Sequence, residues 1–257
     1  MSNNRQFENR TLLVTGAAGK LGSIAAKACA KQGATVILLD KNVAGLEKVY
    51  DNIVSTKAPQ PAIYPFDLLG ATEQNYQELA EIISQKYTVL NGLLHSAAVL
   101  DTLCPVESLE TTDWNNCLNI NLNAPYLLTR VLLPLFIKAE DASIVFTSDT
   151  SARVGQAYWG AYGVSKIALE GFAKILADEY ENSDNLRVNT FLPGPVKSPL
   201  RFKAFPGEDS VNLIDPESLA EIYVQLLGPA SRGTNGQLID STHFNQHAQP
   251  RKYSINP

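Results

Sequence analysis

Short apolar runs alternate along the chain with longer segments whose apolar residues recur at helical spacing. The apolar runs are rich in Val, Ile and Leu and fall at 11–15, 35–39, 62–66, 90–95, 143–147 and 187–192, with a last one at 237–240. The segments with helical spacing fall at 21–32, 43–56, 76–86, 114–138 and 157–180. Nearly continuous apolar runs are typical of strands that are buried on both faces, and their alternation with helices predicts a parallel sheet. The pattern therefore predicts an α/β fold, a doubly wound parallel sheet of about seven strands flanked by helices.

One domain accounts for most of the chain. A length of 257 residues with 45% hydrophobic composition suits a single large α/β core better than two small ones. We expect this domain to span residues 11–244, between a polar N-terminal extension at 1–10 and a polar tail at 245–257. Its least regular stretch, 195–216, follows the sixth predicted strand, and open α/β sheets carry substrate-binding loops at such positions.

Charge and cysteine content narrow the classes of function. The net charge of -5 and the scattered Lys and Arg argue against a nucleic-acid partner, which would need a basic patch. Cys29, Cys104 and Cys117 lack the spacing of metal ligands, so we expect buried thiols in a reducing compartment and no metal site. The polar N-terminus lacks a signal core, and no run approaches the ~18 apolar residues of a membrane span. We therefore expect a cytoplasmic protein with a small-molecule partner and no association with membranes.

A glycine-rich turn joins the first predicted strand to the first predicted helix. Glycines stand at positions 16, 19 and 22, with Lys20 and Leu21 between the last two. Such a turn lets backbone amides and the helix dipole face a pyrophosphate, and Gly16 allows the tight turn that this requires. The βαβ context makes nucleotide binding the better interpretation of a turn that could otherwise be purely structural.

Asp40, at the end of the second predicted strand, bears on which dinucleotide would bind. A carboxylate at this position can accept hydrogen bonds from the ribose hydroxyls and would repel a 2′-phosphate, which favours NAD over NADP. Lys20 and Lys41 act in the opposite direction, because either ammonium could reach a 2′-phosphate. NAD is therefore the preferred prediction, and NADP stays open.

Tyr162 and Lys166 form the most informative pair in the chain. Residues four apart lie on one face of a helix, so the pair places an ammonium beside a phenol. A free tyrosine titrates near ~10, and a neighbouring positive charge favours its phenolate and lowers that pKa. A tyrosine tuned in this way can exchange protons with an alcohol.

These residues occur together with three further motifs in a fixed order. Asp67 follows the third predicted strand, Asn121 lies in a long helix, and Pro193 with Gly194 follows the sixth strand. Taken together, the motifs resemble the classical short-chain dehydrogenase/reductase family over about residues 11–240. The amino-acid sequences of 114–124 and 159–166 look closest to a bacterial branch of oxidoreductases that resemble ketoacyl reductases.

The resemblance implies a Rossmann fold and an NAD(P)-dependent oxidoreductase acting on a secondary alcohol or ketone. In that scheme Tyr162 is the proton donor or acceptor, Lys166 lowers its pKa and holds the nicotinamide ribose, and Asn121 supports a proton-relay water. The family also pairs its long helices in homodimers or homotetramers. Besides Tyr162 and Lys166, the cofactor-binding positions carried over are Gly16, Gly19, Lys20, Leu21, Gly22, Asp40, Asp67, Leu68, Ala97, Pro193, Gly194, Val196 and Ser198.

The chain departs from the family at the position thirteen residues before the catalytic tyrosine. The family has a serine there, whose hydroxyl donates a hydrogen bond to the substrate carbonyl, and this chain has Asp149. An ionised carboxylate only accepts hydrogen bonds, and its charge would raise the pKa of Tyr162 against the effect of Lys166. Three explanations keep the site active: a hydroxyl of Ser148, Thr150 or Ser151 replaces the serine, Asp149 is protonated, or an alcohol substrate donates to Asp149.

Two other functions stay open beside the oxidoreductase. Asp149, together with Ser96 where the family usually has asparagine, is compatible with a catalytically impaired dinucleotide-binding sensor or scaffold. The Gly-x-x-Gly-x-x-Gly spacing of the turn is that of the extended branch of the superfamily, many of whose members act on nucleotide sugars. The chain is too short for the substrate domain that such epimerases and dehydratases usually carry.

Overall fold

All the predicted strands are present and form one parallel sheet. The computed structural model describes residues 6–150 and 153–244. The strand order is β3-β2-β1-β4-β5-β6-β7, and every neighbouring pair is parallel. This confirms the predicted doubly wound α/β architecture. The strands are β1 (Thr11–Thr15), β2 (Thr35–Asp40), β3 (Ala62–Pro65), β4 (Gly92–His95), β5 (Ala142–Thr147), β6 (Leu186–Leu192) and β7 (Leu238–Asp240).

The chain reverses its direction of winding between β1 and β4. It adds β2 and then β3 on one side of β1, and afterwards crosses to add β4 and the remaining strands on the other side. Thr15, the last residue of β1, pairs with Leu39 on one side and with His95 on the other. The loops that leave β1 and β4 therefore diverge at the carboxyl edge of the sheet, which is where open α/β sheets bind ligands.

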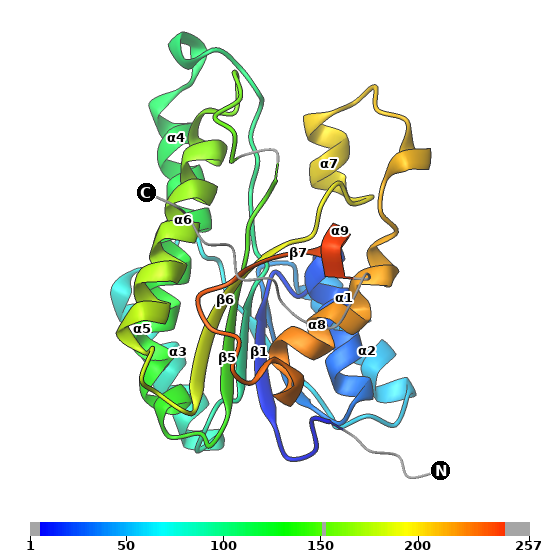
Figure 1. The fold of residues 1–257 in the computed structure, drawn as a ribbon, viewed down its shortest axis with the longest axis vertical. Helices are drawn as coiled ribbons and strands as arrows, with labels where there is room; N and C mark the ends of the chain where they lie inside the picture. The colour runs from blue at the N-terminus through cyan, green and yellow to red at the C-terminus, as the bar shows by residue number, and fades with distance from the viewer. Residues whose placement is uncertain (1–5, 151–152, 245–257) are drawn as a thin grey trace.

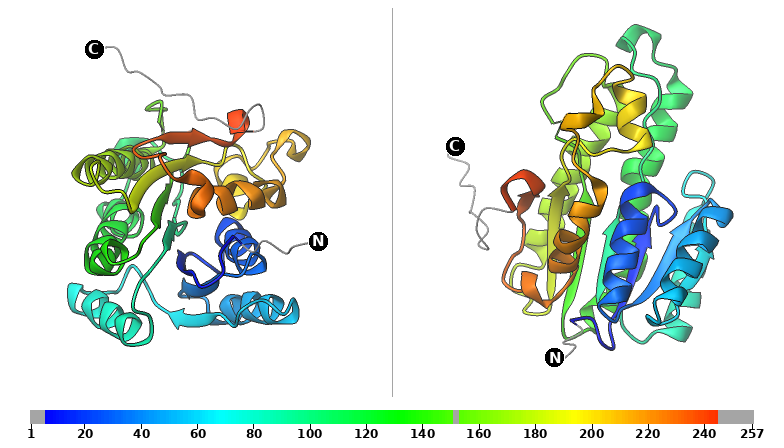
Figure 2. Two further views of the ribbon diagram at one scale, coloured as in Figure 1. Left: turned by 60° about the horizontal axis from the view of Figure 1, so that its bottom comes forward. Right: turned by 90° about the vertical axis from the view of Figure 1, so that its right-hand side faces the viewer.

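Helices cover both faces of the sheet and make a three-layer sandwich (Figure 1). One layer holds α1 (Lys20–Lys31), α2 (Val43–Ser55) and α8 (Ala220–Leu227), and the other holds α3 (Glu73–Lys86), α5 (Ala124–Ile137) and α6 (Gly160–Glu179). The two layers are separated most clearly when the sheet is seen from its lower end (Figure 2). The remaining helices are α4 (Thr111–Leu118), α7 (Pro199–Ala204), α9 (Ser241–Phe244) and 3-10 turns at Val106–Ser108, Ser210–Asn212, Pro216–Leu219 and Pro229–Ser231.

Strands β1 to β6 each contribute to both halves of the core. On β1, Leu12 and Val14 pack toward α1, α2 and α8, whereas Leu13 packs toward α3 and α5. Successive side chains of a strand point to opposite faces, so a nearly continuous apolar run is what a sheet covered on both sides requires.

The domain begins earlier than the sequence suggests. The side chain of Phe7 is fully buried in the core, and its backbone N–H donates to the carbonyl of Gln32 over 3.0 Å. Arg10 donates to the carboxylate of Asp141 over 2.6 Å. Residues 6–10 therefore belong to the packed domain rather than to the extension expected at 1–10, and the predicted tail at 245–257 lies outside the described residues.

The helix predicted at 114–138 begins at Thr111 and contains a widened turn. A π-helical turn at Asn119–Asn123 separates α4 from α5. The run Thr111–Ile137 is 27 residues long and apolar enough to cross a membrane by length and composition alone, which corrects the expectation that no such run exists. Leu128, Leu132 and Phe136 pack against the sheet, which is the arrangement of a core helix.

Gly22 offers a test of how tightly the turn after β1 is packed. A Cβ at Gly22 would lie 2.3 Å from the carbonyl oxygen of Gly16, and this contact between backbone atoms cannot relax easily. Gly22→Ala should therefore lower the unfolding free energy by about 1–3 kcal/mol in urea unfolding. Gly171→Ala is the matched control, because Gly171 is also helical but has open space around its Cβ position. The control should be neutral or stabilising by up to about 1 kcal/mol, and equal effects at both positions would contradict this packing.

Candidate active site

A cleft of about 430 Å³ opens at the carboxyl edge of the sheet, across the ends of β1 and β4. It collects residues from loops that are far apart in sequence. Gly22 lies beneath the cleft rather than on its wall, and Ser148 and Asp149 line the cleft close to Tyr162. The other predicted cofactor-binding residues all line it: Gly16, Gly19, Lys20, Leu21, Asp40, Asp67, Leu68, Ala97, Tyr162, Lys166, Pro193, Gly194, Val196 and Ser198.

The turn after β1 forms an open cradle for an anion. Gly16 has φ 65°, and a Cβ there would lie 2.8 Å from the backbone nitrogen of Ala97, so only glycine allows this close approach. Helix α1 starts without a side-chain cap at Gly19 and without an acidic residue in its first turn. Its first N–H groups and the positive end of its dipole therefore face the cleft unneutralised, which fits a phosphate group.

Asp40 both holds this turn in place and faces the cleft. One carboxylate oxygen accepts from the N–H of Ala18 over 3.1 Å, and the other accepts from the N–H of Asn42 over 3.0 Å. Lys41 and Lys20 line the same part of the cleft. A carboxylate and two ammonium groups therefore surround the position where a ribose would follow the phosphates.

Tyr162 is a buried acid rather than a readily ionised one. Its hydroxyl donates to Oδ2 of Asp149 over 3.0 Å, and its side chain is 4% exposed. Burial and the negative charge of Asp149 raise the pKa of Tyr162 well above its ordinary value. The raising effect that the sequence predicts for Asp149 is therefore present, and the net shift in the pKa of Tyr162 is upward rather than the lowering predicted from Lys166.

Lys166 lies on α6, and its buried amine reaches the carboxyl end of β5. Its Nζ donates to the carbonyl of Thr147 over 2.9 Å and lies 5.6 Å from the centre of the Tyr162 ring. Burial lowers the pKa of Lys166 to about 8, although the charges of Asp149, Cys117 and Glu170 oppose the shift. The amine is therefore close to its titration range at neutral pH.

The hydroxyl of Ser148, one candidate replacement for the family serine, is bonded to another side chain of the protein. Its Oγ donates to Glu170 over 2.7 Å, and Glu170 also accepts from Arg153 over 2.9 Å. Because a serine hydroxyl has one proton, Ser148 cannot donate to a substrate while it keeps this bond. Thr150 is exposed on the loop, and Ser151 lies outside the described residues.

Asn121 acts as a brace inside the widened helical turn. Its side chain accepts from the N–H of Val99 and donates to the carbonyl of Val99, each over 2.9 Å, and donates to Ser165 over 3.1 Å. These bonds tie the loop after β4 to α6, which carries Tyr162. Turns of the π type occur frequently at functional sites. Its side chain is 1% exposed and does not line the cleft, so its predicted support of a relay water stays a prediction.

Thr147 and Glu170 are site residues that sequence reasoning missed. Thr147 supplies the carbonyl that accepts from Lys166, and Glu170 holds Ser148 and contributes to the charge around Lys166. Glu170 could have been found from its spacing, because it lies four residues after Lys166 on the same face of α6. No side-chain pattern marks Thr147, since its contribution comes from the backbone.

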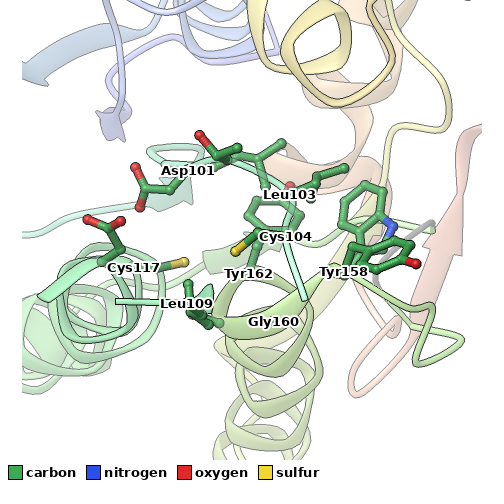
Figure 3. Close-up of a pocket in the computed structure, with 13 residues that line it drawn as sticks. Asp101, Leu103, Cys104, Leu109, Cys117, Tyr158, Gly160 and Tyr162 are labelled. Carbon is green, nitrogen blue, oxygen red and sulfur yellow. The ribbon is translucent and has the colours of Figure 1, made fainter. Parts of the chain in front are cut away.

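The loop at 195–216 folds over the cleft as α7 and a short 3-10 turn. Arg201 lines the cleft and donates to Glu208 over 2.6 Å, and Lys203 donates to the carbonyl of Leu100 over 2.7 Å. Beside this loop, Tyr162 also borders a second cavity of about 20 Å³, around which Asp101 and Cys104 lie as well (Figure 3). Arg201 and Lys203 are thus engaged by the protein itself.

Comparison with known proteins identifies relatives along nearly the whole chain. A family model described as short chain dehydrogenase matches residues 10–209. The uncharacterized oxidoreductase YciK of Escherichia coli K12 is 41% identical over 91% of this chain and 92% of its own. A short chain dehydrogenase of Shigella flexneri 2a, solved with NADP, is 40% identical with a TM-score of 0.88, covering 96% of this chain and 100% of its own. One from E. coli CFT073, solved with NADPH, is 39% identical with a TM-score of 0.88, covering 97% and 100%.

The buried amine of Lys166 should make stability depend on pH. Its lowered pKa means that between about 8 and 10.5 the unfolded chain holds a proton that the folded protein has released. The unfolding free energy of the wild type should therefore rise with pH in this window relative to Lys166→Met, by up to about 1.4 kcal/mol per pH unit. Urea unfolding of both proteins at several pH values measures the difference. A difference that does not change with pH would contradict the burial of the amine.

Proposed function

The chain belongs to the short-chain dehydrogenase family of oxidoreductases, and from this premise we propose that it transfers a hydride between NAD(P)(H) and a secondary alcohol or ketone. The observation that carries the proposal is the arrangement of one cleft. An uncapped helix start, a carboxylate beside the expected ribose position and the Tyr162–Lys166 pair line it together. This order suits a dinucleotide with its phosphates on α1 and its nicotinamide beside Tyr162.

The residues of the cleft suit distinct parts of the dinucleotide. The backbone amides between Gly16 and Leu21 would hold the pyrophosphate, and Asp67 with Leu68 would contact the adenine. Lys166 would bind the nicotinamide ribose. Ala97, Pro193, Gly194, Val196 and Ser198 would line the ribose and nicotinamide end. When bound, the nicotinamide supplies or accepts the hydride.

Tyr162 would hold or move the proton at its hydroxyl oxygen. Because this hydroxyl donates to Asp149 in the structure, an alcohol that donates its own proton to the pair fits more readily than a ketone, which needs a donor. We therefore propose that alcohol oxidation is the direction that the site favours. The bond of Ser148 to Glu170 supports this direction, because it engages the one proton that Ser148 could donate.

The choice between NAD and NADP is decided by opposing charges. Asp40 favours NAD, and the carboxylate keeps lone pairs for ribose hydroxyls beyond its two backbone bonds. The preference for NAD is not supported by the relatives, since those from S. flexneri and E. coli were solved with NADP and NADPH. We propose that Lys41 and Lys20 allow NADP to bind in spite of Asp40.

The proposal also concerns assembly and location. Tyr126, Ile137, Val164, Ile167 and Ile175 are exposed apolar residues on α5 and α6, the helices that the family pairs in homodimers or homotetramers. Free thiols at all three cysteines are compatible with a reducing, cytoplasmic location. The sensor or scaffold alternative has no support among the relatives, which carry the names of oxidoreductases and dehydrogenases.

Binding of the reduced dinucleotides tests the proposed function. Titration with NADH and NADPH, followed by their fluorescence, should show saturable binding of at least one of them. Tyr162→Phe should keep this binding, because it removes only a hydroxyl, and should lower kcat for a secondary alcohol by about 100-fold or more. A protein that binds neither dinucleotide would contradict the proposal. Unchanged kcat in Tyr162→Phe would remove Tyr162 from the chemistry.

Two substitutions at the end of β2 test the discrimination between dinucleotides. Asp40→Asn removes the negative charge and should lower the Kd of NADPH roughly tenfold relative to that of NADH. Lys41→Ala removes a positive charge and should raise the same ratio of NADPH to NADH dissociation constants. Expressing each result as this ratio controls for loosening of the turn that Asp40 holds. A ratio that moves in the same direction in both variants would contradict the assignment.

A further inference from the structure

The reaction centre presents hydrogen-bond acceptors where a carbonyl would need donors. The one hydroxyl proton of Tyr162 goes to Asp149, so the phenol oxygen offers the cleft only lone pairs. In this geometry Asp149 accepts the hydrogen bond from Tyr162, and an ionised carboxylate has no proton to donate. The neighbouring hydroxyl of Ser148 donates its one proton to Glu170 in a hydrogen bond. A substrate fits this centre best when its reacting group carries its own N–H or O–H.

The carboxylate of Asp149 beside the Tyr162 hydroxyl favours a positive reacting group at that point of the cleft. The amine of Lys166 lines the same cleft and is directed at the carbonyl of Thr147. On the loop, Arg201 donates to Glu208 and Lys203 donates to a backbone carbonyl. Opposite charge across an interface of this kind selects the partner that complements it.

The cleft that holds Asp149 also has an apolar lining. Val99, Ile120 and Leu200 line it together with Tyr162 and Asp149. The preferred substrate therefore combines a cationic reacting group with a compact hydrocarbon body.

We propose that the reacting carbon of the preferred substrate bears nitrogen rather than oxygen, as a protonated imine in reduction and as the corresponding amine in oxidation. Asp149 accepts a hydrogen bond from the N–H and stabilises the positive charge, in place of the serine that would polarise a carbonyl. The inference rests on the proposed dinucleotide site and goes beyond the proposed alcohol or ketone to the nitrogen analogue of such a substrate.

Reduction of such a substrate balances without a proton donor at the centre. The hydride of the reduced nicotinamide dinucleotide brings two electrons, which form the new C–H bond at the imine carbon. The π pair of the C=N bond becomes the lone pair of the amine nitrogen, and the dinucleotide is oxidised. The proton on nitrogen stays there throughout. A ketone, in contrast, must gain a proton on its oxygen, and the raised pKa of Tyr162 makes that proton harder to release.

A binding measurement without turnover is the first test. With the protein saturated by its reduced dinucleotide, in the presence of which neither ligand can be oxidised, calorimetric titrations compare N-methylcyclohexylamine, a cation at neutral pH, with the neutral cyclohexanol. The wild type should bind the amine about tenfold more tightly or better. Asp149→Asn should lose this preference, because it keeps the size of the side chain without its charge. Asp184→Asn removes an exposed carboxylate at the opposite edge of the sheet and should keep the preference. Equal binding of the two ligands by the wild type would overturn the inference, as would a preference that survives in Asp149→Asn.

A turnover measurement distinguishes failure of the inference from failure of the proposed function. The wild type should oxidise its reduced dinucleotide faster with 2-methyl-1-pyrroline, a cyclic imine, than with cyclopentanone, its carbonyl counterpart. Asp149→Ser should reverse the order, because serine restores a donor for the carbonyl and removes the charge that favours the cation. A wild type that binds the dinucleotide and prefers cyclopentanone would overturn the inference alone. A wild type that binds no dinucleotide would overturn the proposed function as well.

Discussion

The catalytic end of the cleft depends on one positive charge buried inside the protein, the ammonium of Lys166. Burial disfavours this charge, and the carbonyl of Thr147 together with the carboxylates of Asp149 and Glu170 offsets part of that cost. Burial lowers the pKa of His95, and the charge of Lys166 lowers it further. The imidazole of His95 is therefore neutral and forms a hydrogen bond with the hydroxyl of Thr129.

Asp149 places a hydrogen-bond acceptor at the position where the family has the hydroxyl donor of a serine. A serine at this position would leave the hydroxyl proton of Tyr162 available to the substrate, whereas the carboxylate of Asp149 accepts a hydrogen bond from it. The cradle at Gly16 and the brace at Asn121 do not depend on this exchange, since both are built from backbone and amide contacts. The chain therefore keeps a cleft suited to a dinucleotide while the chemical preference beside it changes from donating to accepting.

The sequence was sufficient where a single residue type determines the local structure. Apolar runs located every strand, and the glycines located the turn after β1, because few alternatives satisfy those patterns. It was insufficient where the outcome is a balance of opposing effects. The pKa of Tyr162 depends on its burial and on the distance to Asp149, and the orientation of Ser148 depends on Glu170, which only the packed structure supplies. The burial of Phe7 likewise follows from a tertiary contact that a polar N-terminal segment does not reveal.

The polarity of the Tyr162 end of the cleft depends on the charge state of Asp149, which infrared spectroscopy measures directly. Difference spectra between wild type and Asp149→Asn, each labelled with ¹³C-aspartate and held at neutral pH, isolate the bands of this one side chain. We expect the paired stretching bands of an ionised carboxylate, which disappear in the variant. A single carbonyl band of a protonated carboxylic acid would contradict this expectation, because Asp149 would then be able to donate to a carbonyl as the family serine does.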